Sequence, residues 1–195
     1  MRPVILVFAK APVAGRVKTR LIPYLSAEEA AALHEDMVRH VFRNLDQLPA
    51  VDVELHTDTR TDAWPEVKVT RKLQVEGDLG IKMHSALVAA LAAGRRQAMV
   101  LGGDSPDLPV EYLTGLLDAT ADVSLGPTRD GGFYAITCRR THPEMFQGVE
   151  WSSPATLSAT VGALLRCGLS VQVGAPWYDV DTREDVDRWT KKRPD

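Results

Sequence analysis

Short apolar runs alternate with longer segments of helical periodicity along this chain. The runs at 3–9 and 98–101 are almost wholly apolar, as is typical of strands buried on both faces of a parallel sheet. Polar and apolar residues alternate at 51–55, which predicts another strand. Further strand-like segments lie at 67–73, 123–126, 133–137 and 171–173.

The segments between these strands predict helices at 26–48, 81–93, 109–119, 154–166 and 183–191. The first of them opens on a capping box formed by Ser26 and Glu29. His34 and His40 lie six residues apart in it, so they do not share a face and are expected at the surface. Strands that alternate with helices predict a single α/β domain over 1–195, with a mainly parallel central sheet flanked by helices.

Composition narrows the class of protein. The 195 residues are 45% hydrophobic, so the chain can bury a core without the help of a metal or disulfide. Cys138 and Cys167 are too few for a disulfide framework and stand in apolar contexts, which predicts buried, reduced thiols in a cytoplasmic protein. The net charge of -3 argues against nucleic-acid binding. No apolar run has the ~20 residues that a membrane span needs.

A basic loop directly follows the first strand. Residues 10–20 hold Lys10, Arg16, Lys18 and Arg20 together with Gly15, and contain no acidic residue. Backbone N–H groups and cations that converge after the first strand predict a cradle for a polyphosphate. The alternative is a solvated basic loop. The loop is neither a Walker A motif nor a Gly-x-Gly-x-x-Gly dinucleotide fingerprint.

Carboxylates follow two other strand-like segments. Asp104 comes after 98–101 and two glycines, and Asp179 and Asp181 follow the last strand. These chain positions converge at the switch point of a doubly wound sheet, where a Mg²⁺ or Mn²⁺ ion would face the basic loop and grip a nucleotide diphosphate. The alternative reading is that Asp104 and Asp107 only cap the helix that begins near residue 109.

Two glycine-containing turns are candidate ligand contacts. Gly77, Asp78 and Gly80 precede a helix and either close over a ligand or form a simple turn. Gly131 and Gly132 either form a floor beneath a ligand or, as Asp-Gly-Gly alone favours, belong to an ordinary hairpin turn.

Six strings in this order resemble a family of bacterial GT-A-superfamily transferases: FAKAPVAGRVKTRL, EGDLGIKM, GGDSPDLP, GPTRDGGFYAI, EWSSPATL and DVDTREDV. Members of that family carry provisional glycosyltransferase assignments, and some are associated with arsenosugar biosynthesis. The superfamily also includes the phospholactate guanylyltransferases, which have a similar Lys-Thr-Arg-Leu loop. The resemblance covers nearly the whole chain. It implies a Rossmann-like GT-A fold, the nucleotide-diphospho-sugar transferase fold.

The resemblance also implies roles for individual residues. Asp104 and Asp181 would be the metal ligands, Asp179 being a less favoured substitute. Residues Lys10, Gly15, Arg16, Lys18, Arg20, Gly77, Asp78 and Gly80 would hold the nucleotide and its phosphates. The sugar or acceptor pocket would be lined by Gly131, Gly132, Tyr134 and Trp151. Trp151 would stack on a sugar, or equally be a core aromatic.

The chain departs from the family pattern at two places. The acidic motif is Asp-Ser-Pro-Asp rather than Asp-x-Asp, which puts metal ligation by Asp107 in doubt. Ile81 and Lys82 stand where the family often has Glu-Arg.

Three functions remain open from the sequence. The first is glycosyl transfer from a nucleoside-diphosphate sugar to a small acceptor, with Asp130 or Glu150 as the base. The second is nucleotidyl transfer from a nucleoside triphosphate with release of pyrophosphate. The third is a non-catalytic protein that binds sugar nucleotides.

Overall fold

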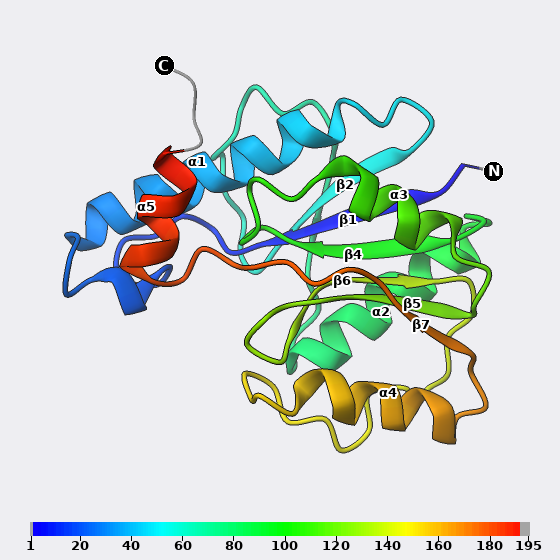
Figure 1. The fold of residues 1–195 in the computed structure, drawn as a ribbon. Coiled ribbons are helices and arrows are strands. Elements are labelled where there is room, and N and C mark those ends of the chain that lie inside the picture. The colour runs from blue at the N-terminus through cyan, green and yellow to red at the C-terminus, as the bar shows by residue number, and fades with distance from the viewer. Residues whose placement is uncertain (1, 192–195) are drawn as a thin grey trace.

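The computed structural model describes residues 2–191, and its elements form one seven-stranded sheet (Figure 1). The strand order is β3-β2-β1-β4-β6-β5-β7. The strands are β1 (Val4–Ala9), β2 (Asp52–Thr57), β3 (Thr70–Leu73), β4 (Ala98–Gly102), β5 (Val123–Pro127), β6 (Phe133–Cys138) and β7 (Val171–Val173). Only β6 runs antiparallel to its neighbours β4 and β5. The predicted α/β fold with a mainly parallel sheet is confirmed.

Helices cover both faces of this sheet, so that the molecule has three layers (Figure 1). The helices are α1 (Ala27–Leu45), α2 (Leu79–Ala92), α3 (Val110–Asp118), α4 (Thr156–Arg166) and α5 (Arg183–Lys191), and a 3₁₀ turn spans Thr19–Leu21. None of the helices in residues 2–191 combines the length and apolar character needed to cross a bilayer.

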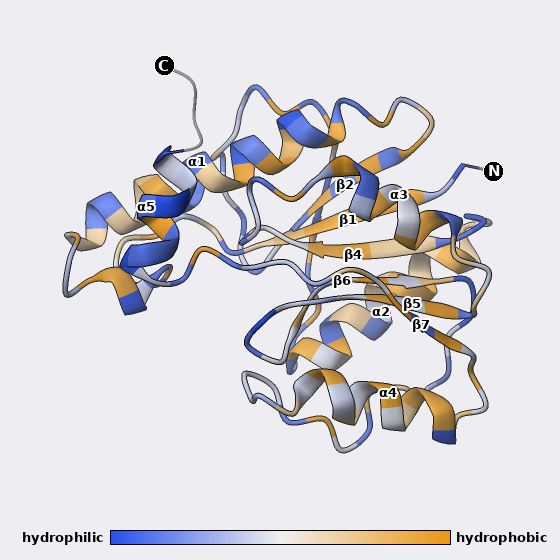
Figure 2. Cartoon of the chain, viewed as in Figure 1, coloured by the Kyte–Doolittle hydropathy of each residue, from blue (hydrophilic) through white to orange (hydrophobic). Residues whose placement is uncertain are grey.

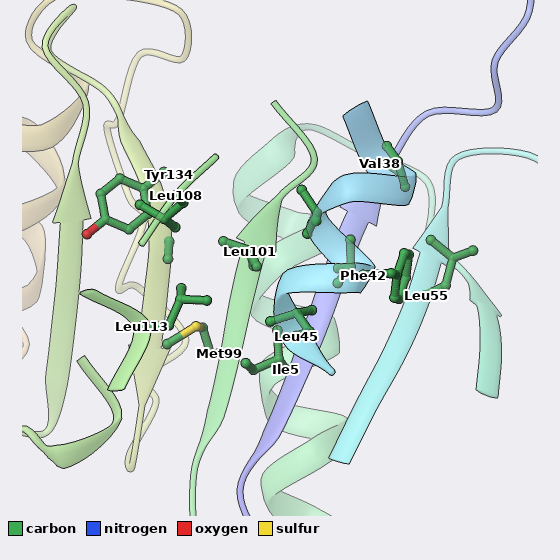
Figure 3. Packing of buried hydrophobic residues seen from close by; sticks show 14 of the residues in the cluster. Ile5, Val38, Phe42, Leu45, Leu55, Met99, Leu101, Leu108, Leu113 and Tyr134 are labelled. Carbon is green, nitrogen blue, oxygen red and sulfur yellow. The ribbon is translucent and has the colours of Figure 1, made fainter. Parts of the chain in front are cut away.

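Each sheet face has its own apolar core. On one face, α1 and α3 contribute Val38, Phe42 and Leu113 to a cluster with Ile5 and Met99 (Figure 3). On the other, α2 and α4 bury Met83, Leu87 and Leu164 against β1, β4 and β6. The central strands β1, β4, β5 and β6 are largely hydrophobic along the ribbon (Figure 2). Two covered faces explain why β1 is buried at every position.

Helix boundaries differ from the sequence prediction where side chains found other partners. Asp107 does not cap α3, whose N-cap is Pro109. The Asp107 carboxylate instead accepts hydrogen bonds from the indole of Trp177 at 3.2 Å and the hydroxyl of Tyr178 at 2.5 Å. The helix predicted from residue 154 begins at Thr156, because 151–155 form turns.

Two predictions of burial also need correction. His34 is buried, with 5% of its surface exposed, because its imidazole packs under the basic loop and contacts the carbonyl oxygen of Lys10 at 3.0 Å. Cys138 is buried as expected, whereas Cys167 is only partly buried, since it lies at the C-terminal end of α4. Both thiols are free.

Candidate active site

The basic loop, Asp104 and Asp181 meet at one point. The Lys18 ammonium lies 2.6 Å from Asp104 Oδ1 and 3.0 Å from Asp181 Oδ1, and donates to the carbonyl oxygen of Val180 at 2.8 Å. These three contacts use all three N–H donors of the ammonium. Three segments, each at least about 75 residues from the next in the sequence, are therefore joined through one cation.

Charge interactions fix the ionisation of this cluster. The Lys18 side chain is 5% exposed, and burial by itself would lower its pKa. Asp104 and Asp181 outweigh that effect and raise the pKa of Lys18 above its ordinary value, so it stays protonated. Burial likewise opposes ionisation of Asp104, but the adjacent Lys18 holds the pKa of that carboxyl below its usual value.

Asp179 has a different environment from its two acidic neighbours. Burial and the nearby charges of Asp104 and Asp181 raise its pKa to about 7, although Ser105 Oγ donates to its Oδ1 at 2.6 Å and favours the charged form. The hydroxyl of Ser105 is also 3.2 Å from the Tyr178 carbonyl oxygen. The loop after β4 is thus tied to the segment after β7 through both Ser105 and Asp104.

The cluster opens into two overlapping pockets. The strand-end pocket, about 540 Å³, is lined by residues that follow β1 and β4 and by Gln74 and Lys82. The hairpin pocket, about 440 Å³, lies at the β5–β6 turn and the entry to α4, and is lined by Thr128, Asp130 and Trp151 among others. Both pockets include Arg20, Asp104, Asp179 and Asp181. This is the carboxyl-end position at which open α/β sheets bind ligands.

The structure distributes the expected phosphate-binding residues unevenly. Lys10, Lys18 and Arg20 line the strand-end pocket, whereas Gly15 and Arg16 lie outside both pockets and are exposed. Gly77, Asp78 and Gly80 also lie outside them, and their segment contributes Leu79 instead. Asp78 is the N-cap of α2, where its Oδ1 accepts from the Ile81 amide at 2.9 Å.

Some of the expected sugar-binding residues line a pocket, and some also pack against neighbouring side chains. Gly132 and Trp151 line the hairpin pocket, and Tyr134 lines the strand-end pocket. Trp151 is partly buried and packs edge-on against Phe133 and Phe146. A Cβ on Gly80 would stand 2.8 Å from Trp151, so this glycine lets the start of α2 approach the indole closely.

Gly131 serves the contact between the β5–β6 turn and α4. Its φ of 93° is in the region that favours glycine, and an added Cβ would stand 2.1 Å from the carbonyl oxygen of Pro154. Its own carbonyl accepts from the Leu157 amide at 2.8 Å. Asp130 Oδ1 completes the turn, because it accepts from Thr128 Oγ1 at 2.5 Å and from the Gly132 amide at 3.2 Å. The strands on either side pair antiparallel, so the hairpin reading of Asp-Gly-Gly holds.

Several pocket residues were not identified from the sequence. Ser152 lines both pockets and has a φ of 60°, which a serine rarely adopts. His34 lines the strand-end pocket, and its Nδ1 is buried without a hydrogen-bond partner. Burial lowers the pKa of His34 below its ordinary value. No sequence signal points to His34, because its position in the helical repeat is typical of a residue on the surface of a helix.

The chain and its fold have known counterparts. Residues 42–153 match the model of a family described as "Uncharacterized protein conserved in bacteria (DUF2064)". The chain belongs to the DUF2064 family. A search of the curated proteins found no match.

Solved structures place this DUF2064 protein among nucleotide-handling folds. A "putative nucleotide-diphospho-sugar transferase" from Desulfovibrio desulfuricans G20 is 30% identical, with a TM-score of 0.88 over 98% of this chain and 88% of that chain. A CMP:2-keto-3-deoxy-manno-octonic acid synthetase complexed with CTP shares the fold at 14% identity and a TM-score of 0.64, over 98% of both chains. A nucleotidyl transferase from Methanothermobacter thermautotroptrophicus does so at 11% identity and a TM-score of 0.64, over 97% of this chain and 96% of that chain.

Proposed function

We propose that this protein is a metal-dependent transferase that moves a glycosyl group from a nucleoside-diphosphate sugar to a small acceptor. The observation that carries the proposal is the Lys18 ammonium between Asp104 and Asp181, at the pocket beyond the carboxyl ends of β1 and β4. The name of the Desulfovibrio neighbour supports the donor class.

The diphosphate of the donor would lie in the strand-end pocket. Lys10, Arg20 and Lys82 line it and bring positive charge to the phosphate oxygens. Arg20 is 69% exposed, so its guanidinium is free to turn from Asp181, 3.4 Å away, toward a bound phosphate. Lys18 has a different role, because its ammonium already contacts the two carboxylates and the carbonyl oxygen of Val180.

Asp104 and Asp181 fit a Mg²⁺ or Mn²⁺ ion. Both direct Oδ1 at the same positive group, the Lys18 ammonium. Among residues 2–191, no cluster of three or more acidic, histidine or cysteine side chains forms a metal site with more ligands. Mg²⁺ commonly takes one or two carboxylates and completes its shell with substrate phosphate and water, which two aspartates permit. Such an ion supplies charge stabilisation for a departing diphosphate.

The transfer itself needs a nucleophile and a proton acceptor. A hydroxyl oxygen of the acceptor would bond to the anomeric carbon of the sugar, while the bond from that carbon to the diphosphate breaks. The nucleoside diphosphate leaves with the electron pair of that bond. Asp130 lines the hairpin pocket and would take the hydroxyl proton, since its two hydrogen bonds both use Oδ1. Glu150 lies outside both pockets and is not favoured for this role.

A donor panel tests the proposal. Thermal-shift and calorimetric titrations with nucleoside diphosphates, sugar nucleotides and nucleoside triphosphates, each with Mg²⁺ or Mn²⁺, should show binding of one sugar nucleotide and its diphosphate. Mass spectrometry should then show release of that diphosphate with acceptor. Release of pyrophosphate from a nucleoside triphosphate would show that the protein catalyses nucleotidyl transfer and not glycosyl transfer. Binding of a sugar nucleotide without turnover on any acceptor would favour a non-catalytic binding protein.

A further inference from the structure

The two overlapping pockets differ in their charge. Lys10, Lys18, Arg20 and Lys82 line the strand-end pocket and balance its four aspartates, Asp58, Asp104, Asp179 and Asp181. The hairpin pocket has a single cationic side chain, Arg20, against the four carboxylates of Asp104, Asp130, Asp179 and Asp181. Two of these, Asp104 and Asp181, also pair with Lys18. The half of the cleft that lies beside the β5–β6 turn is therefore acidic.

The one cation of the hairpin pocket does not reverse this balance. Arg20 Nη1 lies 3.4 Å from Asp181 Oδ2, and Arg20 also lines the strand-end pocket. A phosphate bound there would engage it further. Asp130, whose Oδ1 accepts from Thr128 and the Gly132 amide, has no cationic partner among the ion pairs of residues 2–191.

The rest of the hairpin pocket combines aromatic, aliphatic and hydroxyl side chains. Phe133 and Trp151 meet there with ring centroids 6.3 Å apart and planes at 74°, and Leu79 and Pro154 add further apolar surface. The hydroxyl side chains are those of Thr128, Ser152, Ser153 and Thr156. Aromatic faces carry partial negative charge, attract cations, and pack against the apolar faces of sugars. An anion entering this space would meet the carboxylates, whereas a neutral polyol or a cation would not be repelled.

We propose that the hairpin pocket selects a neutral or positively charged acceptor that presents a hydroxyl, and rejects phosphorylated acceptors. This inference rests on the proposed function and names the acceptor class. It also favours glycosyl transfer over nucleotidyl transfer, because nucleotidyl transfer to a phosphate requires a site that binds the phosphate of the acceptor. A pocket of this charge disfavours such a substrate.

A matched ligand panel tests the selectivity directly. Hexoses, aminohexoses and hexose phosphates of the same skeleton are titrated by ligand-observed NMR, with and without saturating nucleoside diphosphate and Mg²⁺. At least one neutral or amino compound should bind, and at least about fivefold more tightly than its phosphate, as unfavourable charge contacts demand. Equal or tighter binding of the phosphates, or binding of no neutral or amino compound, would overturn the proposal.

The same samples separate this inference from the proposed function. Failure of every nucleoside diphosphate and sugar nucleotide to bind would refute the proposed function. The acceptor ranking measured without nucleotide would still decide the charge selectivity.

A charge variant shows whether the pocket causes the ranking. Asp130→Asn keeps an oxygen acceptor for Thr128 and the Gly132 amide but removes the charge. It should reduce the preference for the neutral compound over its phosphate by at least about threefold, with nucleotide affinity nearly unchanged. Asp118→Asn is the matched control, because Asp118 is exposed at the end of α3 and outside both pockets. The proposal would be contradicted if Asp130→Asn and Asp118→Asn showed the same preference for the neutral compound over its phosphate.

Discussion

Lys18 occupies an uncommon backbone conformation for a lysine, with φ 46° and ψ 38°. Non-glycine residues in this left-handed region cost on the order of 1 kcal/mol or more, and persist where the surrounding contacts determine them. Here the determining contacts are those of the buried ammonium with Asp104, Asp181 and the Val180 carbonyl oxygen. The strain is thus located in the residue that joins the basic loop to both carboxylates.

Removing this ammonium should change the affinity of the site for cations. Lys18→Met keeps an unbranched side chain of similar length but leaves Asp104 and Asp181 without their shared cation. We expect Mn²⁺ to bind at least about fivefold more tightly, because no ammonium competes for the carboxylates. Electron paramagnetic resonance titration without nucleotide measures this. Arg16→Met is the control, since Arg16 is exposed and outside both pockets; unchanged or weaker Mn²⁺ binding in Lys18→Met would show that the two aspartates form no metal site.

Asp104 should be required for turnover but not for folding. In Asp104→Asn the amide oxygen still accepts from Lys18, so the melting temperature should fall little. Loss of one anionic ligand should lower metal-dependent turnover by about 100-fold. Activity assays and thermal denaturation of the two proteins, with Asp118→Asn alongside, provide the check. Full activity in Asp104→Asn would show that Asp104 is not a ligand of the metal.

At the scale of elements, the β5–β6 turn and α4 form one side of the candidate site. The turn reaches α4 through Gly131, whose carbonyl oxygen accepts from the Leu157 amide and whose Cα faces the Pro154 carbonyl. Asp130 is fixed in the same turn by its own hydrogen bonds. A glycine that the sequence suggests as a ligand floor is therefore also demanded by backbone packing.

Two glycine substitutions should have opposite effects on stability. Gly131→Ala introduces a Cβ at φ 93° and 2.1 Å from the Pro154 oxygen, so we expect a loss of about 2 kcal/mol or more. Gly115 lies exposed in α3 with nothing within 4 Å of an added Cβ. Gly115→Ala should therefore stabilise the protein by about 0.5–1 kcal/mol. Chemical denaturation gives both values, and a neutral Gly131→Ala would contradict the close approach.

At the scale of the whole molecule, buried histidines should make stability depend on pH. Burial lowers the pKa of His34 and His56 below the ordinary value of 6.5, although Glu54 partly offsets this for His56. These rings take up a proton only on unfolding as the pH falls below 6.5, which favours the unfolded state. Asp179 acts in the opposite direction. Its pKa is raised to about 7 in the folded protein, so the folded state takes up a proton there first and becomes more stable relative to the unfolded state as the pH falls.

A variant isolates one contribution to this dependence. His56→Gln keeps a side-chain donor near Glu54, 3.0 Å from the imidazole, but does not titrate. Between pH 7 and 5.5 the free energy of unfolding of the variant should fall less steeply than that of the parent, by up to about 1.4 kcal/mol per pH unit. Denaturant titrations across this range measure the two slopes. Identical slopes would mean that folding does not change the pKa of His56.

The sequence by itself determined the elements and their class. Apolar runs and helical periodicity are local properties, so β7 and α5 agree with prediction at both ends, and the other elements differ by a few residues at their boundaries. The sequence also determined which chain segments reach the candidate site, because residues after parallel strands gather at one sheet edge.

Only the tertiary structure decided which side chains meet there. The sequence cannot place Lys18 between Asp104 and Asp181, turn Asp107 toward Trp177 and Tyr178, or bury His34 under the basic loop, since each contact joins residues distant in the chain or on different elements. It likewise cannot show that four carboxylates face the hairpin pocket. Such contacts depend on how the loops pack across the finished sheet, and hydrophobic periodicity carries no information about that.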